Sequence, residues 1–278
     1  MNLFRSLGIV ARAWRSVLPA LVRPALWWPF LVIAAVEGAV LSLLVGFHEP
    51  PLQFLGIPLV RLLGGEVALH YPDFFLRLPF MYARADMVTS VIVTSLGYGA
   101  ATLLFARRFG FEPGETAGRA ALRRAPALFL LTAITVAALW GVGRIGEAVP
   151  RDLLLNSRIV RWGTRAGLLC GDILIQSLMA YASAWVMLQG HRALPALRDS
   201  VRVTVRTFLP TVLLVAIPIL LLYPLNYLAQ RADLVVLKLR PEGIVGVLAA
   251  YIASVVVLGF LLVGSVTRLF LWRLDTTQ

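Results

Sequence analysis

The chain has few of the residues from which most enzyme sites are built. Its 278 residues include one cysteine, Cys170, three histidines and a single lysine, Lys238. One cysteine excludes an intramolecular disulfide, and because Cys170 lies inside an apolar run we expect it to be a small buried residue. The three histidines are far apart in the sequence. Few catalytic or metal-binding constellations are left.

Known catalytic signatures are missing as well. The sequence contains no HExxH, GxSxG, GxxxxGK[ST] or paired CxxC motif. Residues 169–172, Leu-Cys-Gly-Asp, faintly resemble the GxGD motif of intramembrane aspartyl proteases, but position 169 is leucine and no second membrane aspartate in a suitable neighbourhood is evident. The adjacent His48 and Glu49 precede two prolines, as in a solvated turn. We therefore expect no metal and no cofactor, and these absences weigh against an enzyme.

Charge is scarce, and its sign is unbalanced. Charged residues make up 14% of the chain and hydrophobic residues 59%, with a mean hydropathy of +0.83. Soluble domains carry about a quarter charged residues, so this composition indicates a polytopic membrane protein. The net charge of +12 comes from arginines that flank apolar runs, where anionic lipid headgroups are nearer than nucleic acid. We expect membrane lipids as partners and no nucleic acid.

Six apolar runs have about the 20 residues that a helix needs to cross some 30 Å of hydrocarbon. The predicted fold is all-α: a polytopic integral membrane bundle of six transmembrane helices in three hairpins, with amphipathic interfacial helices. Both termini then lie on one side, and the flanking arginines favour the cytoplasmic side of a bacterial inner membrane. The arginine-rich segment 143–165 on the opposite side weakens this bias. The spans are predicted at 26–47, 87–106, 125–142, 166–189, 207–228 and 244–266.

Two other regions are expected to lie on the membrane surface. Residues 1–25 have arginines, no acidic residue and apolar residues at helical spacing, which predicts a basic interfacial helix ahead of a transmembrane domain at 26–278. A mitochondrial transit peptide remains an alternative for this segment. The external segment 48–86 is apolar and aromatic but broken by prolines and glycines. We expect interfacial or re-entrant helices there.

A basic lead-in followed by an early proline precedes each odd-numbered span, which fits either an internal repeat or three ordinary helix starts. The clearest lead-in, in 189–222, has an apolar stripe beside Arg198, Arg202 and Arg206, each four residues from the last. Its guanidinium groups can reach lipid phosphates while their stems cover apolar surface. Arg119 and Arg123, before the third span, are predicted to contact headgroups in the same way.

Ionisable groups inside the spans are the best candidates for function, since each costs about 2.5–3.5 kcal/mol at a helix centre. Glu37 should lie near mid-bilayer, either as a transport group or as a hydrogen-bonding group between helices. Arg144 and Asp172 are expected to pair, with Arg165 as the second choice of partner. The small-residue faces Gly167/Gly171 and Gly97/Ala101 are expected to pack against protein. Two further polar residues, Gln176 and Asn226, are weaker candidates.

Several positions resemble the membrane domain of bacterial glycerophosphoryl diester phosphodiesterases and related uncharacterised six-helix membrane proteins. In the segment QGHRALPALRDSVRVTVRTFLP the matching residues are Gln189, Gly190, Ala196, Leu197 and Ser200. In GETAGRAALRRAPALFLL they are Gly114, Ala120, Leu122 and Pro126, and the closing TRLFLWRLD is similar to the basic end of that domain. The resemblance covers about residues 107–275 and lacks the soluble catalytic barrel. It implies a six-helix membrane module.

Two functions remain open at this point. The first is a non-catalytic membrane module that scaffolds or regulates a partner, which is another membrane protein or a second copy. The second is a permease-like protein that moves a lipid or another amphiphile, favoured by Glu37 and the broken helices of 48–86. A cavity lined by Glu37 would favour the permease, and a tightly packed bundle without one would favour the module. An intramembrane enzyme would need two convergent polar groups.

Overall fold

A computed structural model describes residues 3–111, 114–238 and 240–275 of the chain. Every element in these ranges is a helix, as predicted. Six of the helices are long and apolar enough to cross a membrane, which confirms the predicted number. Residues 1–2 of the predicted interfacial helix and residues 276–278 of the predicted transmembrane domain lie outside the described residues.

The six long helices follow the predicted spans in order. Two of them are built from consecutive pieces: α4, the π-helical turn η4 and α5 form one, and α9 and α10 form another. Prolines in the first turns of α2 and α7 need no backbone donor there. The elements are α2 (Trp28–Val45), α4 (Asp73–Thr89), η4 (Ser90–Thr94), α5 (Ser95–Arg108), α7 (Ala125–Glu147), α9 (Arg158–Met179), α10 (Ala182–Gln189), α12 (Phe208–Gln230) and α14 (Gly243–Asp275).

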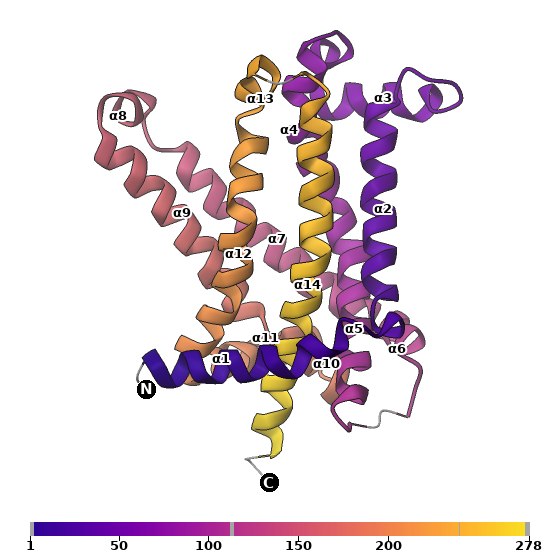
Figure 1. Ribbon diagram of the computed structural model, residues 1–278, viewed down its shortest axis with the longest axis vertical. Coiled ribbons are helices and arrows are strands. Elements are labelled where there is room, and N and C mark those ends of the chain that lie inside the picture. Colours follow the sequence, from indigo (N-terminus) through magenta and orange to yellow (C-terminus); the bar gives the residue numbers. More distant parts are fainter. Residues whose placement is uncertain (1–2, 112–113, 239, 276–278) are drawn as a thin grey trace.

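Shorter helices gather at the two ends of the bundle (Figure 1). We call the end that carries α1, α6, α11 and both termini the basal end, and the end that carries α3, α8 and α13 the distal end. The connecting elements are α1 (Leu3–Val17), η1 (Leu18–Ala20), η2 (Pro24–Leu26), α3 (Gln53–Gly64), η3 (Glu66–Leu69), α6 (Ala117–Arg123), α8 (Arg151–Asn156), α11 (Ala193–Arg206) and α13 (Ala232–Lys238).

Helix α1 crosses the basal end of the long helices (Figure 1). It contacts α12 and α14, and its buried residues recur at intervals of four, three and four: Ser6, Val10, Ala13 and Val17. Leu3, Phe4 and Leu7 stay exposed on the same helix. The basic N-terminal segment is therefore a helix laid against the bundle, with apolar side chains left uncovered.

Helix α14 is the centre of the packing, because it contacts α1, α2, α4, α5, α12 and α13. Phe260 of α14 stacks on Trp27 with ring centroids 4.3 Å apart and meets Phe105 at 4.9 Å. Gly259 lies directly against the Tyr98 hydroxyl, where a Cβ would come within 2.6 Å of the oxygen. The absence of a side chain at that position lets α5 approach α14 closely.

Two boundaries predicted from the sequence are wrong. The second spanning helix begins at Asp73 and not at Met87, so only residues 53–69 of the external segment form separate connecting helices, α3 and η3. The buried side chains of α4 include Phe74, Leu78 and Met81, and α4 packs against α3 and α13. The fourth spanning helix begins at Arg158, where the loop 143–165 was expected to continue. Packing against neighbouring helices explains the longer second helix, whereas residues 158–165 at the start of the fourth have no buried side chain.

Helices α7 and α9, the α7–α9 pair, lean away from the other long helices toward their distal ends (Figure 1). In their most apolar 18 residues only 11% and 17% are buried, against 28–44% in the other four spans. A Cβ on Gly171 would lie 3.1 Å from Val142 of α7, whereas one on Gly167 would meet nothing within 4 Å. The predicted packed face is confirmed at Gly171 and wrong at Gly167; Gly97, which lies against Ile33, and the buried Ala101 confirm the other face.

These environments predict opposite effects for two glycine-to-alanine changes. A Cβ on Gly56 of α3 would lie 2.6 Å from the Cα of Phe47, a backbone atom that cannot move aside cheaply. We expect Gly56→Ala to destabilise the protein by about 1–3 kcal/mol, seen as a lower melting temperature in detergent. Gly167→Ala, the control, should leave it unchanged or slightly higher. Equal losses in the two variants would contradict the packing described for α3.

Candidate functional site

A buried carboxyl group joins α2 to the second spanning helix. The Glu37 side chain lies in the middle of α2 and is 5% exposed. Its Oε2 accepts a hydrogen bond of 2.8 Å from the Tyr82 hydroxyl, and its Oε1 accepts one of 2.6 Å from the Thr89 hydroxyl. Both oxygens are therefore paired inside an apolar bundle, where an unpaired carboxyl would be costly.

A second carboxyl group, that of Asp86, lies close enough to Glu37 for the two to interact electrostatically. Asp86 also accepts a hydrogen bond of 3.0 Å from the Ser90 hydroxyl. Two negative charges at this separation repel strongly away from water, whereas one proton between the oxygens turns repulsion into a hydrogen bond. We call Glu37, Tyr82, Asp86, Thr89 and Ser90 the carboxyl cluster.

The surroundings of the carboxyl cluster are polar but not basic. Tyr251 of α14 is close enough to interact electrostatically with Glu37 and Asp86. Among the described residues, no arginine, lysine or histidine forms an ion pair with either carboxyl. The π-helical turn η4 begins at Ser90, and such turns occur often at functional sites. At 1.5 Å per residue, Glu37 lies about 12 Å from the distal end of α2.

Of the two carboxyl groups in the carboxyl cluster, Glu37 was predicted from the sequence and Asp86 was not. The expected burial of Glu37 is confirmed, but Asp86 was missed because it precedes the predicted start of the second span by one residue. Tyr82 was counted only as an interfacial aromatic residue. The available signal was the spacing of Tyr82, Asp86 and Thr89, which at intervals of four and three lie on one helical face.

The predicted pair of Arg144 and Asp172 does not form. Arg144 instead pairs with Glu147, one turn along the same helix, and its guanidinium lies 5.5 Å from the Trp140 ring centroid. The face of α7 that meets α9 carries Val142 and Gly146, so Arg144, between them in sequence, points away. Arg165, the second choice, lies over the Trp162 and Tyr227 rings, each at 5.7 Å.

The other candidate polar residues are not brought together. Asp172 and Gln176 are half-buried on α9, and no hydrogen bond or ion pair joins the Asp172 side chain to the part of the chain that the structure describes. Asn226 is exposed on α12 and is 3.4 Å from Gln230, which donates to it. In the same described ranges no group of three or more His, Cys, Asp or Glu residues could hold a metal ion.

The arginines predicted to contact headgroups are all exposed at the basal end. Arg202 is 3.7 Å from Asp199, and Arg123 pairs with Glu115. Within the described residues, Arg119, Arg198 and Arg206 have no ion pair. These three guanidinium groups therefore present uncompensated positive charge.

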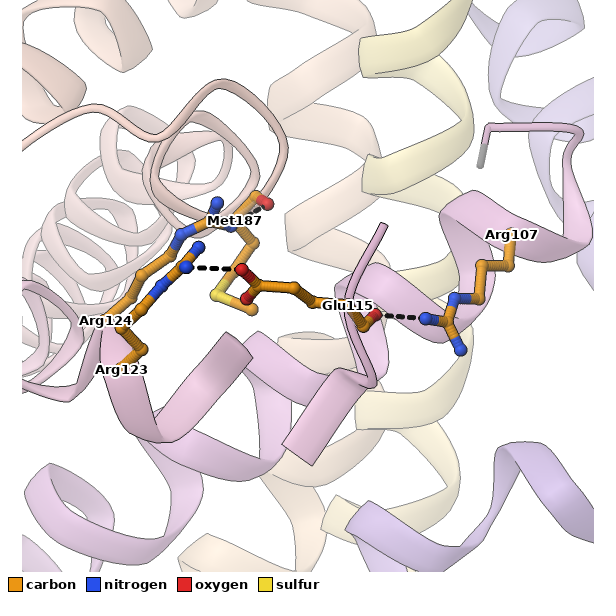
Figure 2. Close-up of polar contacts among 5 residues, drawn as sticks. All are labelled: Arg107, Glu115, Arg123, Arg124 and Met187. Atoms are coloured by element: carbon orange, nitrogen blue, oxygen red, sulfur yellow. Dashed lines mark hydrogen bonds and ion pairs between the residues drawn. The ribbon is translucent and has the colours of Figure 1, made fainter. Parts of the chain in front are cut away.

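Neighbouring arginines hold the basal connections in place (Figure 2). Glu115 takes part twice, because its carboxylate pairs with Arg123 and its carbonyl accepts a hydrogen bond from Arg107. Arg124 donates to the carbonyl of Met187 in the last turn of α10, where carbonyls lack helical partners. Burial, and then the charge of Arg123, lower the pKa of Arg124, but an arginine remains cationic. Arg107 thus ties the end of α5 to the segment before α6, and Arg124 ties the end of α6 to α10.

The chain matches no protein-family model, no curated protein and no solved structure. The likeness to the membrane domain of glycerophosphoryl diester phosphodiesterases therefore stays a prediction.

The hydrogen bonds of Glu37 predict how its variants behave. Glu37→Gln should fold, because the Tyr82 and Thr89 hydroxyls can accept as well as donate and so suit an amide. Glu37→Leu leaves the buried Tyr82 hydroxyl without its partner, whereas the Thr89 hydroxyl can still donate to the Asp86 carbonyl, and should cost about 1–3 kcal/mol of stability. The melting temperature of each purified variant in one detergent checks the order. If the glutamine and leucine variants lost equal stability, the hydrogen bonds would not be what holds this site.

Proposed function

We propose that the chain is a non-catalytic, multi-pass membrane protein that binds a second membrane protein through the α7–α9 pair and scaffolds or regulates it. The observation that carries this proposal is the low burial of the pair, 11% and 17% of its most apolar residues. A helix pair so little covered by its own bundle has surface available for partner helices. The missing catalytic motifs and the resemblance to a membrane module support the same function.

The exposed face of α9 has the chemistry of a helix–helix interface. Gly163 and Gly167 have open space where a side chain would be, so the backbone of a partner helix can approach closely. The exposed Cys170 and Leu174 lie on the same face of the helix, three and seven residues after Gly167. Another membrane protein fits this surface better than acyl chains do.

The membrane setting is part of this proposal. We place the chain in a bacterial inner membrane, with three helical hairpins, interfacial helices α1 and α11, and cytoplasmic termini at the basal end. Support comes from the exposed basal arginines, which fit the positive-inside rule, since only Glu115 and Asp199 of the described connections there are acidic. Exposed Leu3, Phe4 and Leu7 suit α1 to a headgroup layer.

The single cysteine offers a direct test, because Cys170 is exposed on α9, three residues from Gly167, and the prediction that it is buried is wrong. A thiol-linked benzophenone at Cys170, irradiated in native membranes, should give one dominant adduct with a protein, identified by mass spectrometry. The matched control is Cys170→Ala with Ala35→Cys, which moves the probe to an exposed position on α2. Adducts of Cys170 with lipid alone, or the same protein adducts from both positions, would contradict the proposal.

A permease-like protein that transports a lipid or another amphiphile is the second candidate. The carboxyl cluster favours it, because neighbouring carboxyl groups inside a bundle often mark ion or proton pathways. It ranks second because hollows of about 330 and 240 Å³ lie at the basal end, and neither is lined by Glu37 or Asp86. Transport would move ahead if Glu37→Gln folded normally yet lost a cellular phenotype that Glu37→Asp retained.

A further inference from the structure

A groove opens at the basal end between α10, α11 and the last turns of α14. Its volume is about 240 Å³. Phe208 starts α12 two residues after Arg206, and Gln189 ends α10 four residues after Trp185, so the groove lies at the level where spanning helices end. The lining residues are Trp185, Asp199, Arg202, Val203, Arg206, Phe270, Arg273 and Leu274.

The rim of this groove is positive. Three arginines line it, and the one acidic residue among the lining residues is Asp199. The Asp199 carboxylate already lies 3.3 Å from Nδ1 of His191 and 3.7 Å from Arg202. Arg206 has no ion pair among the described residues. The groove therefore has positive charge to offer an anion.

The inner wall of the groove is apolar and rigid. Trp185 and Phe270 meet edge to face with ring centroids 5.0 Å apart. The His191 ring stacks on the Trp185 ring with centroids 4.9 Å apart. Val203 and Leu274 complete the apolar lining. A small inorganic anion gains nothing from such a wall, whereas the glycerol and upper acyl carbons of a lipid bury apolar surface on it.

We propose that this groove binds the headgroup of an anionic phospholipid, with its phosphate between Arg202 and Arg206 and its glycerol against Trp185 and Leu274, which are both partly exposed. Guanidinium groups bind phosphate oxygens with two parallel hydrogen bonds, which a point charge does not. The apolar wall and the depth at the helix ends select a membrane lipid over a free phosphate. Arg202 also lines a second hollow of about 330 Å³ with Arg198, which extends the positive surface along α11.

The test uses the full-length protein, stripped of lipid in a neutral detergent and titrated while bound lipid is counted by native mass spectrometry. The three probes are phosphatidylglycerol, phosphatidylcholine with the same acyl chains, and inorganic phosphate. The groove variant is Arg202→Gln with Arg206→Gln. Its matched control, Arg5→Gln with Arg108→Gln, removes two exposed arginines at the same end but outside the groove.

We expect phosphatidylglycerol to bind the wild-type protein more tightly than phosphatidylcholine. At about 1 kcal/mol per arginine, the groove variant should bind it about thirtyfold more weakly and Arg206→Gln alone about fivefold more weakly. The control should change less than about threefold, because exposed charges at a distance are screened. Equal losses in groove variant and control would overturn the proposal, and so would displacement of the lipid by inorganic phosphate. All the substituted arginines are exposed, so loss of folding is not expected, and the single variant repeats the test with one change.

Discussion

The packing around α14 is the interaction on which the rest of the structure depends. This 33-residue helix contacts three of the other spanning helices, namely α2, the helix formed by α4 and α5, and α12, as well as α1 and α13. Small residues make this possible, since Gly259 admits the Tyr98 hydroxyl and Gly264 admits Val17 and Phe105. Inside hydrocarbon a helix satisfies its own backbone, so helices associate through such close contacts and not through hydrophobic transfer. Elements that touch α14 are well covered, and the α7–α9 pair, which does not contact it extensively, is the least covered.

Polar groups have hydrogen-bond partners where helices pack closely, and fewer partners where helices are sparsely packed. Glu37 is buried with two hydroxyl donors and a second carboxyl beside it, which fixes α2 against α4. Asp172 is on the sparsely packed α9 and has no such partner in the described ranges. At the basal end, Arg124 joins the end of α6 to α10 through a hydrogen bond, and other arginines line the groove beside α11. The same chain thus has an internal polar site, an uncovered helix pair and a basic surface, each suited to a different ligand.

Much of the fold could be predicted from the sequence, because hydropathy and helix length depend on local composition. The six spans, the buried Glu37 and the exposed arginines of α11 follow from such local patterns. Asp86 could not be placed, since whether a charged residue lies inside a span depends on how far packing extends the helix. Arg144 was paired wrongly for a similar reason: the face of α7 that meets α9 is set by Val142 and Gly146, which no count of residues identifies.

Spin-label accessibility shows directly whether α9 presents an uncovered face. The measurement uses nanodiscs that hold a single copy of the purified chain. Labels are placed one at a time along residues 163–175 in a Cys170→Ala background. We predict frequent oxygen collisions for labels at Gly163, Gly167 and Leu174, which is 44% exposed. Labels at Leu168 and Gly171, which face α7, should show few collisions. Uniformly few collisions, including at Gly163 and Gly167, would mean that α9 packs into its own bundle, and would contradict the account.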